Sequence, residues 1–490
     1  MNVFANIIFL TWIPVAIAIF SRMKAEKGLI FAAVAGVLFL PMASMPMPLV
    51  PYAKNTAIGL GLFAGALLTD PGKITSFRFS WVDFPMALCV LVPFPNGVVN
   101  GIPPYDSFAA AVGNGLVFGI PWFLGRAFLG DMYRMRQLAM AFFYGGLSYI
   151  LPCLFEMKVG PEFHHILYGF YPHPDYLQAI REGGFRPMVC MQHGLMVGFF
   201  MSAATLCGIA LWAAKAMPKT ILRMPSWLMI FVLGSVAVLC KSTGALILLI
   251  SGVVVIFLTK KIRTYALVYV LIASPLAYIF ARTLGGWDGE NLAAMVQEYL
   301  SKDRADSLRT RFGSETLLVA KAMEKPVLGW GPDGRQQVTD PLDPTHMLAI
   351  PDGMWEGTLG AWGWVGLGAA YAVLLMPLIV LIRKIPNRAW GSGPMAAPAA
   401  FAVIGALYGL DNLMNNMVNP LYYLALGGVA SFALSKQPLP PRAGPARPKQ
   451  RPLTTAAPVL PSAGSPQLPA PLAPLPDDFC APNDSPVQVI

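Results

Sequence analysis

The sequence predicts an all-α polytopic membrane protein, with about 12 to 13 transmembrane helices and a large, partly helical external loop. The first reason is composition: 56% of the 490 residues are hydrophobic and only 12% are charged, whereas soluble domains are about one quarter charged. The second is a series of apolar runs long enough to cross a hydrocarbon core of about 30 Å. The third is that Lys and Arg cluster in alternate connections between these runs.

Thirteen apolar runs are candidate transmembrane spans. The first run has no basic segment before it, so we expect a retained helix and not a cleavable signal peptide. In chain order, the expected spans are 3–20, 28–50, 55–69, 81–98, 105–125, 136–157, 188–213, 226–240, 242–259, 264–281, 358–382, 395–412 and 418–435.

Two long polar segments divide these spans into three groups. The end of the chain differs from the rest, because fifteen of the 54 residues from position 437 onward are Pro. Proline at this density prevents regular helices and sheets, so we expect a disordered tail that either recruits a cytoplasmic partner or is dispensable. The expected regions are N-terminal transmembrane helices over 1–157, a first external loop over 158–187, central transmembrane helices over 188–281, a large external loop over 282–357, C-terminal transmembrane helices over 358–435 and the Pro-rich disordered cytoplasmic tail over 436–490.

The basic residues predict the orientation of the chain. Connections rich in Lys and Arg stay in the cytoplasm, which places the N-terminus outside, the C-terminus in the cytoplasm and both long loops outside. The formal net charge of +10 is distributed over the cytoplasmic connections, so we expect no nucleic-acid partner. The main clusters are Arg22, Lys24 and Lys27; Arg126, Arg134 and Arg136; Lys215, Lys219 and Arg223; Lys260, Lys261 and Arg263; and Arg383, Lys384 and Arg388.

The large loop contains its own helical pattern. Apolar residues between positions 292 and 300 recur at i, i+3, i+4, i+7 and i+8, which predicts one apolar helix face suited to lying on the bilayer or capping the bundle. A second helix is expected around 314–324, because the residue before Pro326 is disfavoured in the α conformation. Gly329 and Gly331 then allow a tight turn.

Five basic residues near the outer membrane boundary are candidates for binding a phosphate or pyrophosphate. The guanidinium of Arg forms bidentate, charge-assisted hydrogen bonds with such groups, and an isolated cation at membrane depth is a functional candidate. A solvated or snorkelling surface cation is the alternative for each of them. The candidates are Arg186, Lys241, Arg309, Arg311 and Arg335.

Four residues are candidates for a general base. His193 falls just inside an expected span and His346 lies in the large loop, whereas Asp352 and Glu356 are one helical turn apart before the next span. The alternatives are a packing histidine and acidic residues that favour a helix N-terminus. His and Cys residues show no metal-ligand spacing, so we expect neither a metal nor a cofactor.

Three segments resemble the O-antigen ligase and polymerase superfamily of bacterial envelope polysaccharide assembly. Residues 241–246, KSTGAL, open a span in the manner of the family's Ser/Arg/Gly-Ala-Leu signature. Residues 309–332 contain the Arg-bearing segment, the short helix and a Pro-Val-Leu-Gly-Trp-Gly turn, and residues 352–367 match the Gly-rich entry into the next span. The resemblance covers roughly 190–435 and rests on the order and spacing of these segments.

This resemblance implies a glycosyltransferase of the bacterial cytoplasmic (inner) membrane, which transfers or polymerises a glycan carried on undecaprenyl pyrophosphate at the outer face. It implies that cations hold the pyrophosphate, that a base deprotonates the acceptor hydroxyl without a metal, and that membrane lipid and the polyprenyl tail contact the spans. The acceptor is a glycan, a lipid or a protein, so ligase and polymerase both stay open. Lys241 stands where the family usually has Arg, and Asp352 where it has His.

Three other functions are compatible with the composition. A transporter or flippase for a lipid-linked sugar would place ionisable residues at mid-bilayer, whereas the polar residues here concentrate at the outer rim. Another class of multispan glycosyltransferase would carry an acidic pair in its first external loop, but residues 51–54 contain no acid. A non-catalytic scaffold of polysaccharide assembly would make use of the Pro-rich tail.

Overall fold

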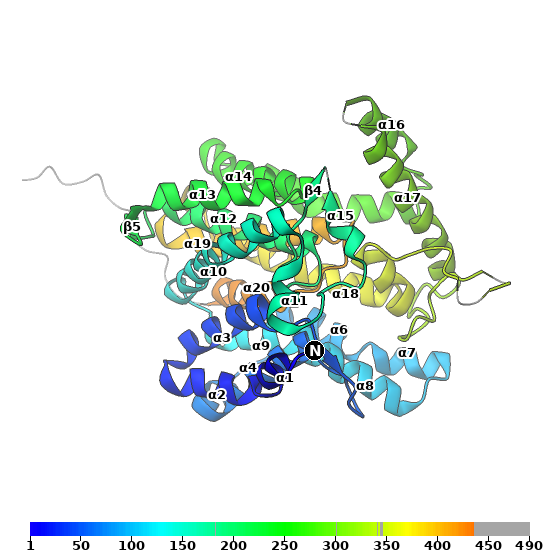
Figure 1. Ribbon diagram of the computed structural model, residues 1–490, viewed down its shortest axis with the longest axis horizontal. Coiled ribbons are helices and arrows are strands. Elements are labelled where there is room, and N and C mark those ends of the chain that lie inside the picture. Colours follow the sequence, from blue (N-terminus) through cyan, green and yellow to red (C-terminus); the bar gives the residue numbers. More distant parts are fainter. Residues whose placement is uncertain (182, 300, 341, 344–345, 436–490) are drawn as a thin grey trace, which may run out of the picture. The chain divides into compact units, whose positions relative to one another are not determined.

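The structure is a computed structural model that describes residues 1–435 except 182, 300, 341 and 344–345. Its regular structure is almost entirely helical (Figure 1), which confirms the all-α fold class. The Pro-rich tail expected over 436–490 lies outside the described residues. Strands form three short antiparallel hairpins in the described part: β1 (Ser44–Met45) with β2 (Tyr52–Ala53), β3 (Ile180–Arg181) with β4 (Gly184–Phe185), and β5 (Thr220–Ile221) with β6 (Met224–Pro225).

The N-terminal helices are mostly short because Pro and Gly interrupt them. α1 and α2 meet at a bend of 52°, and a π-helical turn separates α8 from α9. The helices are α1 (Val3–Leu10), α2 (Trp12–Arg22), α3 (Ala25–Phe39), α4 (Lys54–Thr69), α5 (Pro71–Thr75), η1 (Trp81–Asp83), α6 (Phe84–Leu91), α7 (Pro93–Asn100), α8 (Pro104–Asn114), η2 (Gly115–Gly119), α9 (Ile120–Phe128) and α10 (Met132–Val159).

The central and C-terminal helices include the longest ones of the described chain. They are α11 (Glu162–Tyr168), η3 (Tyr176–Ala179), α12 (Gly194–Ala213), α13 (Ser226–Leu239), α14 (Thr243–Ile262), α15 (Ala266–Thr283), α16 (Glu290–Tyr299), α17 (Lys302–Met323), α18 (Met354–Lys384), η4 (Asn387–Ala389), η5 (Gly393–Met395), α19 (Ala396–Asp411) and α20 (Pro420–Leu434).

Each of the thirteen expected spans coincides with helical structure, but their lengths differ. Eight helical segments are long and apolar enough to cross a membrane, or nine if the bent α1–α2 pair is one span. Four other expected spans correspond to α3, α4, α13 and α20, which have only 15, 16, 14 and 15 residues. At 1.5 Å per residue these helices reach about 21 to 24 Å, less than the core of about 30 Å. The chain is a multi-pass membrane protein with fewer full-length spans than expected among its described residues.

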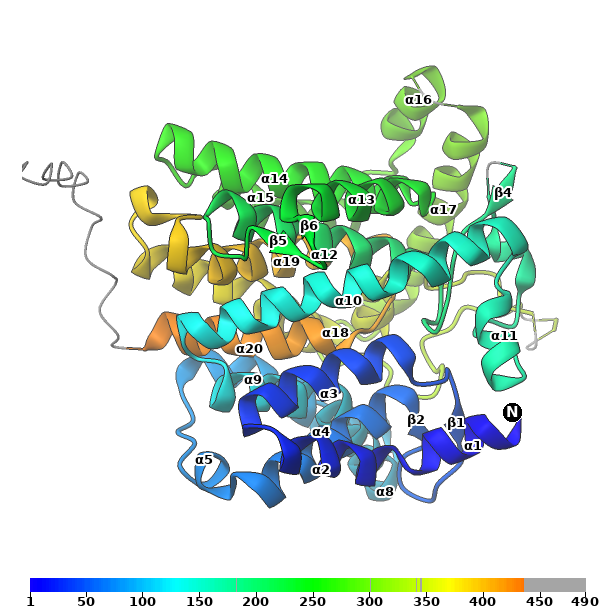
Figure 2. The ribbon, with the colours of Figure 1, turned by 60° about the vertical axis from the view of Figure 1, so that its left-hand side comes forward.

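Helix α12 occupies the centre of the helix bundle. It packs against α10, α13, α14 and α19 (Figure 2), and most of its side chains are buried. Glycines allow close contacts along it: a Cβ at Gly198 would lie 2.6 Å from Cβ of Ser242. At its N-terminus, the buried Glu156 carboxylate of α10 accepts hydrogen bonds from the backbone N–H groups of Met188 and Val189. The segment that leads into α12 is therefore fixed against α10.

Helix α18 is interrupted at Gly363, whose φ of 63° and ψ of −165° are not helical. The turn from the large loop lies against this break, because Trp364 N–H donates to Pro326 O at 2.7 Å and Gly331 N–H donates to Ala361 O at 2.9 Å. The buried Asn96 of α7 contacts the same region, donating to the carbonyl of Ala361 at 3.2 Å. The Pro-Val-Leu-Gly-Trp-Gly turn thus joins α7 to α18.

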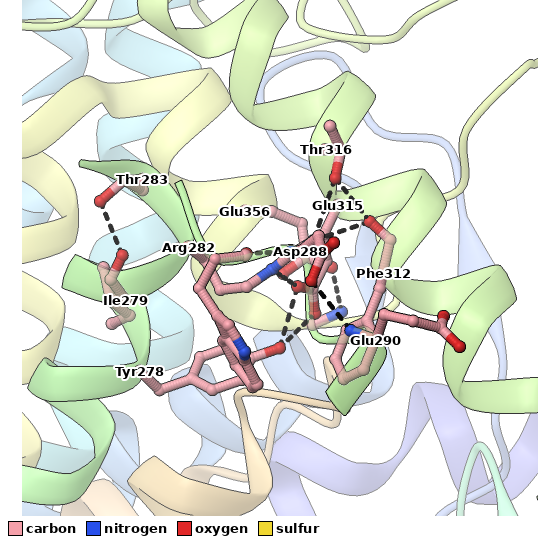
Figure 3. Close-up of polar contacts among 12 residues, drawn as sticks. Tyr278, Ile279, Arg282, Thr283, Asp288, Glu290, Phe312, Glu315, Thr316 and Glu356 are labelled. Carbon is pink, nitrogen blue, oxygen red and sulfur yellow. Dashed lines mark hydrogen bonds and ion pairs between the residues drawn. The ribbon is translucent and has the colours of Figure 1, made fainter. Parts of the chain in front are cut away.

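Helix α17 is fastened to α15 by a buried ion pair. Figure 3 shows Arg282 of α15 facing Glu315 of α17, with 2.7 Å between Nε and Oε2. Arg282 also donates to the backbone carbonyls of Phe312 and Trp287, each at 2.7 Å, and Tyr278 donates to the Glu315 carboxylate. Because each of the three guanidinium nitrogens of Arg282 donates a hydrogen bond, α17 is fastened to the end of α15.

The helices of the large loop differ partly from expectation. The apolar spacing correctly predicted α16 (Glu290–Tyr299). The second helix was expected around 314–324, but α17 begins at Lys302, because the Ser301 side chain accepts a hydrogen bond from Arg304 N–H and caps the helix. The expected end before Pro326 agrees with the observed end of α17 at Met323.

Candidate functional site

A polar cavity of about 530 Å³ lies where the first turns of α12, α14 and α17 converge. We call it the cationic cavity. Helix N-termini carry a partial positive charge, so three of them beside one cavity favour an anion. The lining residues are Gln178, Arg181, Arg186, His193, Leu195, Lys241, Ser242, Thr243, Gly244, Ile247, Val296, Ser301, Asp303, Arg304, Ser307, Leu308 and Arg311.

Arg186 and Lys241 come from different parts of the chain and are joined through backbone groups. The guanidinium Nη2 of Arg186 donates to Lys241 O at 2.8 Å, and Lys241 Nζ donates to Arg181 O at 2.9 Å. Arg186 is buried, and Lys241 has a φ of 52°, a left-handed conformation that costs a non-glycine residue about 1 kcal/mol or more. A lysine with a strained backbone beside a buried arginine makes this cavity wall a candidate binding site for an anion.

Helix α17 contributes two further cations, Arg304 and Arg311. Together with Leu308 they follow an i, i+4, i+7 spacing, which places all three on the helix face that lines the cavity. Arg309 lies two residues before Arg311 and therefore points to another side. The spacing from Arg304 to Arg311 is visible in the sequence, but it becomes informative only once a helix is known to begin at Lys302.

The charge of the cavity is strongly positive. Five described lining residues are cationic (Arg181, Arg186, Lys241, Arg304 and Arg311) and one, Asp303, is acidic. Arg181 and Arg304 were not among the sequence candidates, since neither stands out by its local sequence. Their contribution is visible only when the β3–β4 hairpin and α17 are placed beside α14.

His193 lines the cavity and caps α12. Its Nδ1 accepts a hydrogen bond from Leu195 N–H at 3.1 Å, so Nε2 carries the proton and donates to Gln178 Oε1 at 3.0 Å. Burial, followed by the nearby charge of Arg186, lowers the pKa of His193 to about 4. The imidazole is therefore neutral near pH 7, and both of its nitrogens are engaged, which suits a positioning role better than that of a base.

Five sequence candidates are not among the residues that line the cationic cavity: Arg309, Arg335, His346, Asp352 and Glu356. Arg309 donates to Glu290 at 2.8 Å and to Asp306 at 3.1 Å, which joins α17 to α16 on the exposed side. Arg335 and His346 are exposed in the segment after α17, and neither is among the residues that line the cavity.

Asp352 and Glu356 have different environments although they are one helical turn apart. Asp352 is exposed and pairs with Arg311, with 3.4 Å between its Oδ2 and Nε of the arginine. Glu356 is buried, and its Oε1 accepts a hydrogen bond from Gly353 N–H at 2.6 Å, which caps α18. Of the four base candidates, Asp352 is therefore the carboxylate in direct contact with a cavity cation.

An apolar groove of about 620 Å³ runs between α15 and α18. Its walls carry aliphatic and aromatic side chains, among them Phe280 and Leu284 at the end of α15 and Trp364 beside the break in α18. Leu284 is two residues beyond Arg282, which anchors α17. The groove thus ends near the helix that contributes two cations to the cationic cavity.

Comparison with known proteins adds no further assignment. No protein-family model matches the chain, and no curated protein matches it significantly.

Proposed function

We propose that this protein is a glycosyltransferase of the bacterial cytoplasmic membrane, of the O-antigen ligase or polymerase type, acting on a glycan carried by undecaprenyl pyrophosphate. The observation that carries the proposal is the cationic cavity, with five cations and one acid among its described lining residues. Pyrophosphate is a compact polyanion that several cations and helix N-termini bind together. The alternation of basic connections supports a location of this cavity at the outer face.

The cations have a direct role in the proposed reaction. As the bond between the sugar C1 and the pyrophosphate oxygen breaks, its electron pair moves to the leaving pyrophosphate. Arg186, Lys241 and Arg311 stabilise that growing negative charge, and they act without a metal ion. The acceptor hydroxyl oxygen attacks C1 from the opposite side, which gives inversion at C1.

Asp352 is the best-supported base for the acceptor hydroxyl. It receives the hydroxyl proton while the new C1–O bond forms, and its contact with Arg311 keeps the carboxylate beside the pyrophosphate. His193 has both ring nitrogens engaged, and Glu356 is occupied in capping α18. His346 is exposed in the segment after α17. The apolar groove between α15 and α18 accommodates part of the polyprenyl tail.

A transporter of lipid-linked sugars is the second candidate. The interrupted helices favour it, since α18 breaks at Gly363 and a π-helical turn separates α8 from α9. The position of the cations argues against it, because Arg186 directly follows β4 and Lys241 lies in the connection between α13 and α14, so neither is in the middle of a span. A transporter would move the lipid-linked glycan intact, whereas a transferase releases the pyrophosphate carrier.

The test is to reconstitute the protein with an undecaprenyl-pyrophosphate-linked oligosaccharide and an acceptor, and to measure released undecaprenyl pyrophosphate. We expect Arg311→Ala and Lys241→Ala to lower release by about 100-fold or more, as loss of a charge-stabilising donor does. Arg309→Ala is the matched control on the same helix and should retain release within about threefold, because exposed ion pairs contribute little. Equal release by all three variants would reject the cationic cavity as the donor site.

A further inference from the structure

A second pocket lies at the opposite end of α10 and α12 from the cationic cavity. Its volume is about 460 Å³, and its walls come from the start of α10, the end of α12 and the segment before and within the first turn of α19. The 20 residues of α12 separate the two sites by about 30 Å. This distance is close to the thickness of a hydrocarbon core, so the two sites face opposite membrane surfaces.

Lys215 enters this pocket from an unusual backbone position. At the end of α12, Ala216 N–H donates to Leu211 O at 2.8 Å and Lys215 N–H donates to Trp212 O at 2.9 Å, the hydrogen-bond pattern of a Schellman motif. The left-handed residue of that motif is usually Gly, but here it is Lys215, with a φ of 54°. Lysine is less stable than glycine in this conformation by about 1 kcal/mol. Reversal of the chain at this point would therefore be satisfied by glycine, and the lysine side chain indicates an additional role for its ammonium group.

Arg136 of α10 provides a second cation. Its Nε donates to the carbonyl of Ala216, which leaves the terminal nitrogens of the guanidinium directed away from that bond. Asp131, the N-cap residue of α10, is paired with Arg134 at 2.8 Å. No acidic side chain is among the described residues that line the pocket, so its two cations, Arg136 and Lys215, give it a net positive charge.

The remaining walls are apolar or aromatic. Leu211 and Ala397 are buried, Pro394 is exposed, and Tyr133 has 61% of its surface exposed. Trp212, adjacent in α12, is 51% exposed. Exposed Tyr and Trp side chains next to basic residues are characteristic of the level at which lipid headgroups meet the hydrocarbon core.

We infer that this pocket binds the phosphate of an anionic phospholipid, with the diester group between Arg136 and Lys215 and an acyl chain beside Tyr133 and Trp212. Two cations from different helices suit one phosphate, while the apolar walls suit the glycerol and acyl carbons. A free phosphate would leave those walls exposed to water. The inference is independent of the glycosyltransferase proposal, because it involves the other end of the bundle.

The experiment uses the full chain in nanodiscs or detergent, with native mass spectrometry to count retained phosphatidylglycerol against phosphatidylcholine. The decisive variant is Lys215→Gly, because glycine restores the usual Schellman residue. We expect it to keep or raise the thermal unfolding midpoint while lowering phosphatidylglycerol retention about fivefold, the contribution of one cation near a membrane. Arg136→Gln should lower retention to a similar degree.

Arg263→Gly is the matched control. Arg263 is also a basic residue with a left-handed backbone, φ 55°, at the end of α14, but it does not line the pocket. We expect it to keep phosphatidylglycerol retention unchanged. Equal retention in wild type, Lys215→Gly and Arg136→Gln would overturn the inference, as would equal loss in Lys215→Gly and Arg263→Gly. Displacement of the lipid by glycerol phosphate at equal concentration would overturn the lipid as occupant and indicate a soluble phosphate ester.

Discussion

Arg311 lies between the cationic cavity and Asp352, lining the first and pairing with the second at 3.4 Å. One guanidinium thus contacts both the proposed leaving-group site and the proposed base. In the proposed reaction, this ion pair holds the Asp352 carboxylate beside the bound pyrophosphate.

Asp352→Asn should separate proton transfer from donor binding. We expect kcat to fall about 100-fold or more, as loss of a general base does, while the KM for the lipid-linked donor changes by less than about threefold. Glu298→Gln on the exposed face of α16 makes the same change of charge away from the cavity and should leave both constants unchanged. An unchanged kcat in Asp352→Asn would assign the proton to another group.

The pH dependence of stability should reflect His193. Its pKa is about 4 in the folded protein because burial, and then Arg186, disfavour the imidazolium, whereas the unfolded value is about 6.5. The unfolded chain binds more protons between these values, so the stabilisation is complete above about pH 6.5 and declines as the pH falls toward 4. At pH 5 the loss is about 2 kcal/mol for this group.

Thermal unfolding at pH 7.5 and pH 5 measures this effect. His193→Asn keeps a side chain able to cap α12 but removes the titration, so its unfolding midpoint should fall less between the two pH values than that of wild type. His346→Asn changes an exposed histidine and should behave like wild type. Identical pH dependence in all three proteins would contradict a buried neutral His193.

Gly363→Ala should disturb the contact between α18 and the turn at 326–331. A Cβ at Gly363 would lie 2.3 Å from Val327 O, and its φ of 63° disfavours other residues. We expect a loss of at least about 2 kcal/mol in unfolding free energy. Gly368→Ala is the control on the same helix, since a Cβ there meets no atom within 4 Å, and it should match wild type in a denaturant or thermal series.

Glu315→Gln should release α17 from α15. The variant leaves the buried Arg282 without its ionic partner, which costs about 3 kcal/mol or more. Glu324→Gln removes an exposed acid that pairs with Lys321 on the same helix and should cost less than about 1 kcal/mol. Limited proteolysis between α15 and α18 is the measurement, and faster cleavage is expected in Glu315→Gln alone.

The sequence predicted helices well because apolar periodicity and length identify buried or lipid-facing helices without knowledge of their neighbours. The length of an apolar run, however, did not always predict the length of the helix that forms within it. Pro41 and Pro51 lie beyond the end of α3, and α4 is separated from it by the β1–β2 hairpin. Helix α3 consequently ends at Phe39, eleven residues before the end of the apolar run 28–50, whereas α4 agrees with its expected run 55–69 to within one residue.

Residues of the candidate site could be predicted from the sequence where a charged residue stands next to apolar spans. Arg186 and Lys241 are cations next to apolar spans, and both line the cationic cavity. Arg309 appeared equivalent to Arg311 in the sequence, but a shift of two positions turns a helical side chain by about 200°. The break at Gly363 depends on a distant segment, Pro326 and Val327, so no local pattern revealed it.

The walls of the cationic cavity come from three segments, 178–195, 241–247 and 296–311. During synthesis a ribosome delivers these segments in that order. A nascent chain that stops before α17 therefore presents Arg186 and Lys241 without Arg304 or Arg311. The cationic cavity proposed as a polyanion site is consequently completed late in biogenesis, only after α17 has packed against the inserted helices.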